Sequence, residues 1–208
     1  MGMLLAIHPK NPEPRKVLDV VKRLNDGAVV VCPTDTVYAF ACSAHQPRAM
    51  EAIARLKGTK AHKTNLSLIC KDLSQLSLYA RAIDTPGFRV MKKALPGPYT
   101  FIVPASNEIP KLFKNKKHAV GIRVPDHPIP LAIVEELGHA LVVTSVHDED
   151  ELLDHTTDPE LIHERIGHQV ELVIDGGMGG MQGSTVINLT GPEPEVLRVG
   201  KGPVDGLL

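Results

Sequence analysis

The sequence predicts a single α/β domain built on a mixed sheet, and three observations support this fold class. Segments with helical spacing of apolar residues alternate with short apolar runs over most of the chain. In the C-terminal third, such runs follow one another with short connections, which predicts antiparallel as well as parallel pairing. The 208 residues are 43% hydrophobic and show no change in composition that would mark a linker.

The expected helices have apolar residues three or four positions apart, and glycine or proline lies near several of their boundaries. In the first of them, Val17, Val20 and Leu24 share one face before Gly27 ends the helix. Helices are expected over residues 15–26, 49–56, 85–94, 129–137 and 159–166. Strands are expected over residues 28–32, 66–70, 99–103, 120–124, 141–144, 170–174, 184–189 and 195–199.

The composition excludes several classes of protein. The 23 Lys+Arg residues balance 24 Asp+Glu residues, so the chain is not a polycation that coats nucleic acid. No uncharged apolar run reaches the roughly 18 residues of a membrane span, and the N-terminus lacks the apolar region of a secretory signal. We therefore expect a soluble, cytoplasmic protein with no membrane partner. Cys32, Cys42 and Cys70 are expected to be free thiols rather than disulfide partners or zinc ligands.

The charges are nevertheless segregated along the chain. Residues 109–125 contain five Lys or Arg side chains and no acid, and residues 55–63 contain four more. Residues 146–164 contain eight acids and neither Lys nor Arg. The two basic stretches either meet across one cleft, where they would concentrate phosphates or other anions, or form ordinary solvated faces.

The segment Pro33-Thr34-Asp35-Thr36-Val37-Tyr38 is the first candidate for a binding site. It brings two threonine hydroxyls and a carboxylate to the end of an expected buried strand, where α/β proteins commonly bind ligands. The alternative is a turn in which Thr34 and Asp35 cap a following helix.

Three further patterns are weaker candidates. Lys57-Gly58-Thr59-Lys60 is either a helix C-terminus with dipole-compatible lysines or a phosphate contact, and it is not a Walker loop. The glycine-rich residues 175–180 precede a strand rather than a helix, so they do not form a dinucleotide-binding fingerprint. A metal-dependent enzyme that uses His147 and His155 with Asp148 or Asp154 is retained as an alternative.

Five motifs, taken in order, resemble those of the threonylcarbamoyl-AMP synthase superfamily, the YrdC/YciO group. They are residues 33–40 (PTDTVYAF), 96–103 (PGPYTFIV), 121–128 (GIRVPDHP), 175–177 (DGG), and 184–186 (STV) with Arg198. The matches run from about residue 8 to residue 202 and define one YrdC-like domain. The resemblance implies a twisted, open α/β sheet with a positively charged concave face.

The resemblance also implies an activity. The family joins L-threonine, bicarbonate and ATP into threonylcarbamoyl-adenylate and pyrophosphate, for N6-threonylcarbamoyladenosine in tRNA. The matched positions imply catalytic roles for Lys57 and Arg123, and substrate binding by Thr34, Thr36, Tyr38 and Ser145. They imply nucleotide binding by Lys57, Thr144, Ser184, Thr185 and Arg198. Such groups would hold a triphosphate with its Mg²⁺ and act by positioning and electrostatics, with no metal site in the protein.

The chain departs from the family pattern at three positions. The Lys-x-Arg element reads Lys57-Gly58-Thr59, and the Ser-Ala-Asn element reads Ser145-Val146-His147. Ala39 stands after Tyr38, where the family has glycine. These changes resemble the YciO-type branch of the superfamily.

Two hypotheses follow from these departures, beside the metal-dependent alternative. One is a synthase-like enzyme with an altered site. The other is a nucleotide- or double-stranded-RNA-binding paralogue that lacks synthase activity and hydrolyses an adenylate instead. Lys111, Lys114, Lys116 and Lys117 would bind duplex RNA or tRNA weakly and in a salt-dependent manner, or would form only a solvated lysine cluster.

Overall fold

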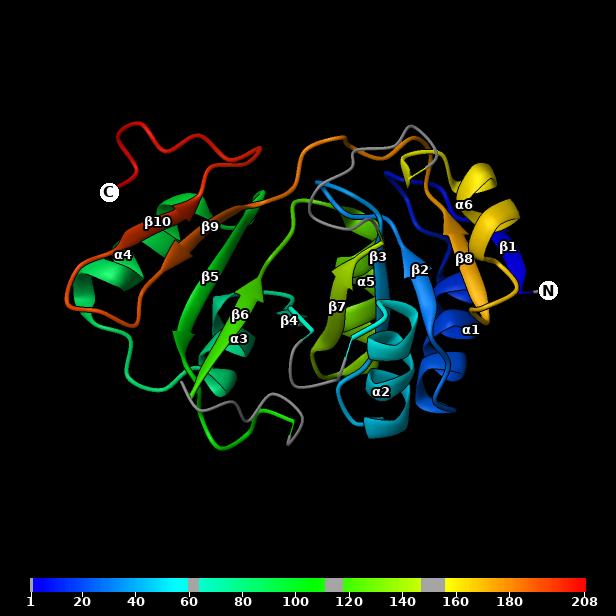
Figure 1. The fold of residues 1–208 in the computed structure, drawn as a ribbon, viewed down its shortest axis with the longest axis horizontal. Helices are drawn as coiled ribbons and strands as arrows, with labels where there is room; N and C mark the ends of the chain where they lie inside the picture. Colours follow the sequence, from blue (N-terminus) through cyan, green and yellow to red (C-terminus); the bar gives the residue numbers. More distant parts are fainter. Residues whose placement is uncertain (1, 60–63, 111–117, 147–155) are drawn as a thin grey trace.

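The computed structural model describes residues 2–59, 64–110, 118–146 and 156–208. Within these residues the strands form one open sheet in the order β1-β8-β2-β3-β7-β4-β6-β5-β9-β10 (Figure 1). Parallel pairs such as β2 with β8 and β4 with β6 alternate with antiparallel pairs such as β3 with β7 and β5 with β6. The expected α/β class with a mixed sheet is therefore confirmed.

The expected helices and strands are all present, with small differences at their ends. The strands are β1 (Met3–Ala6), β2 (Val30–Cys32), β3 (Ala39–Ser43), β4 (Ser67–Ile69), β5 (Tyr99–Pro104), β6 (Ala119–Arg123), β7 (Leu141–Ser145), β8 (Leu172–Asp175), β9 (Thr185–Asn188) and β10 (Glu195–Arg198). The helices are α1 (Pro14–Asn25), α2 (Pro47–Leu56), α3 (Leu73–Tyr79), α4 (Thr85–Ala94), α5 (Pro128–Leu137) and α6 (Pro159–Ile166).

Three of these elements, β1, β3 and α3, were not expected from the sequence. β1 extends the sheet N-terminal to residue 8 by pairing with β8. β3, not a helix, is the next element after Thr34 and Asp35, and it pairs antiparallel with β2, so these two residues do not cap a helix. The helix-cap alternative for this segment is therefore wrong, and the segment is a connection between two buried, adjacent strands.

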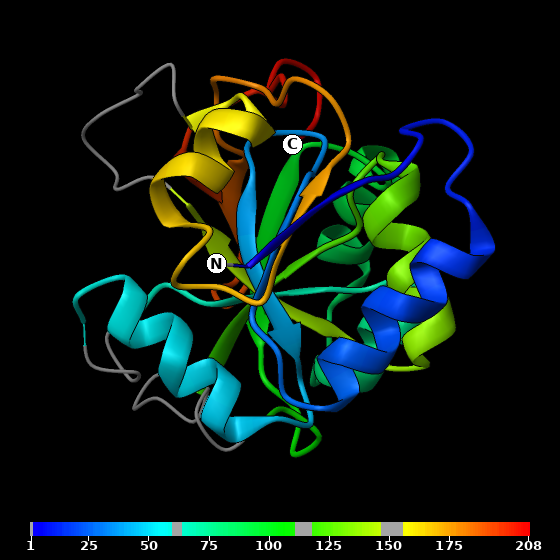
Figure 2. The ribbon, with the colours of Figure 1, turned by 90° about the vertical axis from the view of Figure 1, so that its right-hand side faces the viewer.

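The helices cover the two halves of the sheet unequally. Around β1, β8, β2 and β3, α1 and α5 lie on one face and α2 and α6 on the other (Figure 2). Around β5, β6 and β9, α3 and α4 lie behind the strands in Figure 1, and no described helix lies in front of them. No described helix therefore covers the front face of this half of the sheet.

Aliphatic side chains make up most of the core on both faces of the sheet, and the larger cluster also contains aromatic side chains such as Tyr38 and Phe101. Val20 and Leu24 of α1 pack with Ile133 of α5 on one face, and Met50 and Ile53 of α2 lie in the larger cluster on the other. All three cysteines are free and buried, as expected, and burial raises the pKa of both Cys32 and Cys42 to about 12. Among the described residues, no helix is long and apolar enough to cross a lipid bilayer.

The glycine-rich loop between β8 and β9 packs closely on the segment that joins β2 to β3. The backbone N–H of Gly180 donates to the carbonyl of Thr36 at 2.7 Å. A Cβ atom at Gly180 would lie 2.3 Å from that carbonyl oxygen, which is closer than any real contact. Only glycine therefore permits this approach, and the approach holds the two loops together.

We predict that Gly180→Ala lowers the free energy of unfolding by about 1–3 kcal/mol, because the added methyl group must displace backbone atoms. Gly191→Ala is the matched control, since its Cβ would meet its nearest neighbour at an ordinary 3.8 Å. Chemical denaturation of both variants measures the difference. Equal stability of the two variants would contradict the close packing of the loops.

Candidate functional site

A pocket of about 270 Å³ opens on the face of the sheet that α3 and α4 leave uncovered. A row of small side chains, Ala39, Ser67 and Thr100, contributes to its lining, and neighbouring strands bring these residues together. Gly121 lies between Ser67 and Thr100, and a Cβ there would approach the Ser67 Oγ to 2.8 Å. The pocket is a hollow because small residues line this part of the sheet.

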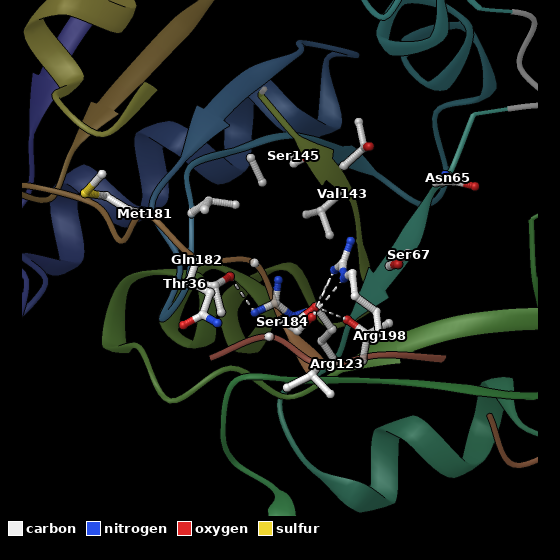
Figure 3. Close-up of a pocket in the computed structure, with 17 residues that line it drawn as sticks. Thr36, Asn65, Ser67, Arg123, Val143, Ser145, Met181, Gln182, Ser184 and Arg198 are labelled. Carbon is white, nitrogen blue, oxygen red and sulfur yellow. Dashed lines mark hydrogen bonds between the residues drawn. The ribbon is translucent and has the colours of Figure 1, made fainter. Parts of the chain in front are cut away.

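Six of the expected site residues line this pocket, and Figure 3 draws them together with the other lining residues. They come from the β2–β3 connection, β6, β7, β10 and the residue that precedes β9. These residues are Thr36, Arg123, Thr144, Ser145, Ser184 and Arg198. Residues that are far apart in the sequence thus converge on one site.

A directed chain of hydrogen bonds holds Arg123 at the pocket. Its Nη2 donates to the Asp35 Oδ1 at 2.7 Å and to the Thr36 Oγ1 at 3.0 Å. The Thr34 hydroxyl donates to the Val37 carbonyl at 2.7 Å, so the Thr36 hydroxyl must donate its own proton to Thr34, 3.0 Å away. Both threonine hydroxyls are therefore committed to fixing Arg123.

Asp35 is the buried counter-charge of Arg123. Its Oδ2 accepts a hydrogen bond from the Asp126 backbone N–H at 3.0 Å, so both carboxylate oxygens are engaged. Burial lowers the pKa of Arg123, Asp35 raises it, and the nearby Arg198 lowers it again. Because that pKa starts from the very high ordinary value of arginine, the guanidinium stays charged at physiological pH.

Arg198 is held in a different way. Its Nη2 donates to the Ser184 carbonyl at 2.9 Å and its Nε to the same oxygen at 3.2 Å. The Ser184 hydroxyl lies 2.7 Å from the Thr100 hydroxyl. Among the described residues, no carboxylate forms an ion pair with Arg198. Its charge therefore faces the pocket without a counter-ion from the described chain.

The pocket consequently favours anions. Arg123 and Arg198 are its charged lining residues, and the described lining contains no carboxylate. The Nε of Arg123 is buried and has no hydrogen-bond partner in the described part of the chain. Arg123 has the carboxylate of Asp35 as its ion-pair partner and Arg198 has none among the described residues, so a bound oxyanion would reduce the charge repulsion between the two guanidinium groups.

Three expected site residues have structural roles outside the pocket lining. Thr34 fixes the β2–β3 connection, as described above. The Tyr38 hydroxyl donates to the Gly177 carbonyl at 2.7 Å, and burial raises the pKa of this phenol. The Thr185 hydroxyl donates to the Gly202 carbonyl at 2.6 Å and accepts from the Gly200 N–H. Their hydroxyls bond inside the protein, so the geometry favours positioning roles over the direct ligand contacts that we expected.

Lys57 also does not line the pocket. It is the C-cap residue of α2, consistent with the helix-end interpretation of Lys57-Gly58-Thr59-Lys60. Lys60, His147, His155, Asp148 and Asp154 lie outside the described residues, as do Lys111, Lys114, Lys116 and Lys117. The expected metal-binding and RNA-binding residues therefore remain predictions, and the described residues contain no cluster of three metal-ligating side chains.

Several lining residues were missed by sequence reasoning. Ser67 and Thr100 lie in strands that were expected, but only the register of β4, β6 and β5 shows that they face the pocket. Other lining residues lie in connections, where no periodic pattern indicates which side chains point into the site. They are Asn65, Met181, Gln182 and Val199.

The fold and the pocket define an α/β protein with a cationic pocket on the face of an open sheet that no described helix covers. The sequence profile of the Sua5/YciO/YrdC family, described as telomere recombination, matches residues 22–200. This chain belongs to that family. The Escherichia coli protein YciO is 39% identical over the full length of both chains, and its crystal structure superposes with a TM-score of 0.92.

Two more distant relatives carry functional descriptions. The human threonylcarbamoyl-AMP synthase is 32% identical over 179 residues, which cover 83% of this chain and 62% of the human protein. The crystal structure of P. abyssi Sua5 complexed with L-threonine is 27% identical, with a TM-score of 0.88. The match covers 98% of this chain and 59% of that protein. The resemblance to this superfamily and to its YciO-type branch is thus confirmed.

We predict that Asp35→Asn destabilises the protein by about 3 kcal/mol, because Arg123 would remain buried and charged without its counter-charge. The control is Glu135→Gln, which removes the carboxylate of an exposed ion pair with Lys71. That change should leave stability close to that of the unmodified protein. Equal effects of both substitutions in chemical denaturation would show that the buried pair has no special role.

Proposed function

We propose that the pocket binds an adenine nucleotide, with the phosphates at Arg123 and Arg198. The observation that carries this proposal is the pair of guanidinium groups at a pocket lined by no described carboxylate. Arginine presents a planar fork of donors that suits phosphate oxygens, and a buried setting strengthens each contact. Ser145, on the same side of β7 as Val143, borders the same pocket and provides a further hydroxyl group.

A magnesium ion would enter with the nucleotide rather than bind to the protein beforehand. Mg²⁺ prefers oxygen ligands, chiefly carboxylates, phosphates and water. The described lining provides hydroxyl groups but no carboxylate, so the phosphates and water molecules would supply most of its ligands. In that position the ion would neutralise part of the phosphate charge.

The related synthases suggest the reaction class. In a synthase-like reaction, a carbamate oxygen attacks the α-phosphorus of ATP, a new O–P bond forms, and the α–β phosphoanhydride bond breaks to release pyrophosphate. Arg123 and Arg198 would stabilise the charge that develops on the phosphate oxygens, so no side-chain nucleophile is needed. L-threonine and bicarbonate would provide the carbamate, as the family resemblance implies.

The altered motifs support a lower rate of adenylate formation in this protein than in the related synthases. The planar guanidinium of the Lys-x-Arg element is replaced by Thr59, whose hydroxyl lies 2.6 Å from the Thr64 hydroxyl. The asparagine of the Ser-Ala-Asn element is replaced by His147. We therefore propose a YciO-type nucleotide-binding protein in which synthase activity is low. The alternative is a paralogue that hydrolyses an adenylate, which threonine-independent release of AMP would reveal.

Isothermal titration calorimetry tests nucleotide binding directly. Binding of ATP or AMP is expected in the millimolar range or tighter, and Arg198→Ala should weaken it about 10- to 150-fold, the equivalent of about 1.5–3 kcal/mol. Arg89→Ala, which removes an exposed arginine from α4, is the matched control and should change nothing. Absent nucleotide binding, or equal binding by both variants, would refute the proposal.

Restoring the family motifs tests the reaction. L-threonine-dependent release of pyrophosphate should be weak or absent in this protein, because loss of one transition-state donor commonly reduces the rate about 10²- to 10³-fold. The double substitution Thr59→Arg, His147→Asn should increase that rate, and each single substitution provides a control. A high rate that the double substitution leaves unchanged would contradict the role of the altered motifs.

A further inference from the structure

β1 is a terminal strand of the sheet, and only one of its two edges is paired within the described chain. It pairs in parallel with β8, and it lies at the front of the molecule in Figure 2, between α1 and α6. The strand reads Met3-Leu4-Leu5-Ala6 and carries no charged side chain. An uncharged open edge can pair with a strand of another chain, so natural proteins usually protect such an edge. We call the edge of β1 that faces away from β8 the outer edge.

The hydrogen bonds to β8 show which backbone groups lie on the outer edge. The N–H groups of Met3 and Ile7 donate to carbonyl groups on the β8 side at 3.1 and 2.8 Å. Successive residues of a strand present their N–H and C=O groups to opposite edges, so those of Leu4 and Ala6 point outward. Among the described residues, the N–H groups of Leu4 and Ala6 have no hydrogen-bond partner. These two donors are available to an incoming strand.

Lys16 of α1 occupies the outward carbonyl of Ala6. Its Nζ donates to that oxygen at 2.7 Å and to the Glu13 Oε1 at 2.6 Å. The Glu13 Oε2 accepts from the His8 N–H at 3.0 Å, and the hydrogen bond from Lys16 is the main cause that lowers the pKa of Glu13 to about 2. Glu13 is therefore charged at neutral pH and holds the ammonium group against the outer edge.

His163 of α6 occupies the outward carbonyl of Gly2, at the other end of the outer edge. Its Nε2–H donates to that oxygen at 2.7 Å, and the Gly2 N–H donates to the Gly167 carbonyl at 2.6 Å. The imidazole lies directly against the backbone at Gly167, where a Cβ atom would approach the His163 Cδ2 to 2.7 Å. The absence of a side chain at Gly167 thus lets α6 present the ring to the outer edge.

Pairing of β1 with the same strand of a second copy would need the groups that these side chains occupy. In an antiparallel pair about a two-fold axis, the Leu4 N–H of one chain would donate to the Ala6 carbonyl of the other. The Ala6 N–H would donate to the Leu4 carbonyl, and no like charges within β1 would oppose the arrangement. Lys16 blocks the first of these bonds, and His163 blocks any extension of the pairing to Gly2.

We propose that Lys16 and His163 block the outer edge of β1 and thereby keep this chain from pairing strand to strand with a second copy. The outer edge is a latent self-association surface, and the partner that it fits is another β1. The two side chains come from helices on opposite faces of the sheet, so they close the outer edge from both sides (Figure 2). This role is separate from the pocket, because no residue of β1, α1 or α6 lines it.

Analytical ultracentrifugation tests the proposal through removal of the two donors. The double variant Lys16→Met, His163→Phe keeps an aliphatic chain and a ring but cannot bond the two carbonyl groups. Its dimer dissociation constant should be about tenfold or more below that of the unmodified protein. Lys71→Met is the matched control, because the Lys71 side chain is also 38% exposed and also pairs with a carboxylate, that of Glu135 in α5. The control should not associate, and a double variant that remains monomeric would overturn the proposal.

A third substitution, Ala6→Pro, separates strand pairing from aggregation of a damaged fold. The Ala6 N–H points outward, so proline removes a donor that pairing needs and leaves the bonds between β1 and β8 in place. The triple variant should return to the monomer. Association that persists in the triple variant would have another cause, and the proposed block at the outer edge would then be wrong.

Amide hydrogen exchange measured by NMR examines the same edge residue by residue. In the unmodified protein, the amides of Leu4 and Ala6 should exchange fast, whereas β8 should protect those of Met3 and Ile7. In the double variant, protection of Leu4 and Ala6 should increase with protein concentration. Strong protection of Leu4 and Ala6 in the unmodified protein would show that the outer edge is already paired, which would also overturn the proposal.

Discussion

The guanidinium of Arg123 and the carboxylate of Asp35 lie 2.7 Å apart, and both side chains are more than nine-tenths buried. A charge pair in such a setting loses its hydration, so it persists only where further hydrogen bonds satisfy its remaining atoms. Thr36 and the Asp126 N–H supply those bonds, while one nitrogen of Arg123 lacks a partner among the described residues. The pair joins the β2–β3 connection to β6 and holds the Arg123 side chain at the pocket.

The architecture of the sheet explains why this pair lies beside a pocket. Helices cover both faces of the half that contains β2, β3 and β8, whereas β5, β6 and β9 have helices on one face. Small residues on the uncovered face leave a hollow, and the segments before β9 and after β10 enclose it with Gly183 and Gly200 in close contact. The pocket therefore forms on the uncovered face of the sheet, where connections between strands, rather than described helices, border it.

The elements that the sequence predicted have either a helical apolar period, such as α1, or a continuous run of β-branched residues, such as β2. β3 was missed because residues Ala39–Ser43 have neither an alternation of polar and apolar side chains nor a run of β-branched residues. The family resemblance identified Arg123, Arg198 and Ser184, which line the pocket. The partnership of Asp35 and Arg123 spans 88 residues of sequence and depends on tertiary structure, as does the exposure of Met181 at the pocket. Local patterns carry no information about either.

The central proposal is that the two arginines bind the phosphates of a nucleotide in the pocket. A crystal structure of the protein grown with AMP tests this claim most directly, because it locates both ends of the ligand at once. We predict that the phosphate lies within hydrogen-bonding distance of Arg198 and Arg123. Adenine placed between the arginines, or AMP bound away from this pocket, would contradict the account.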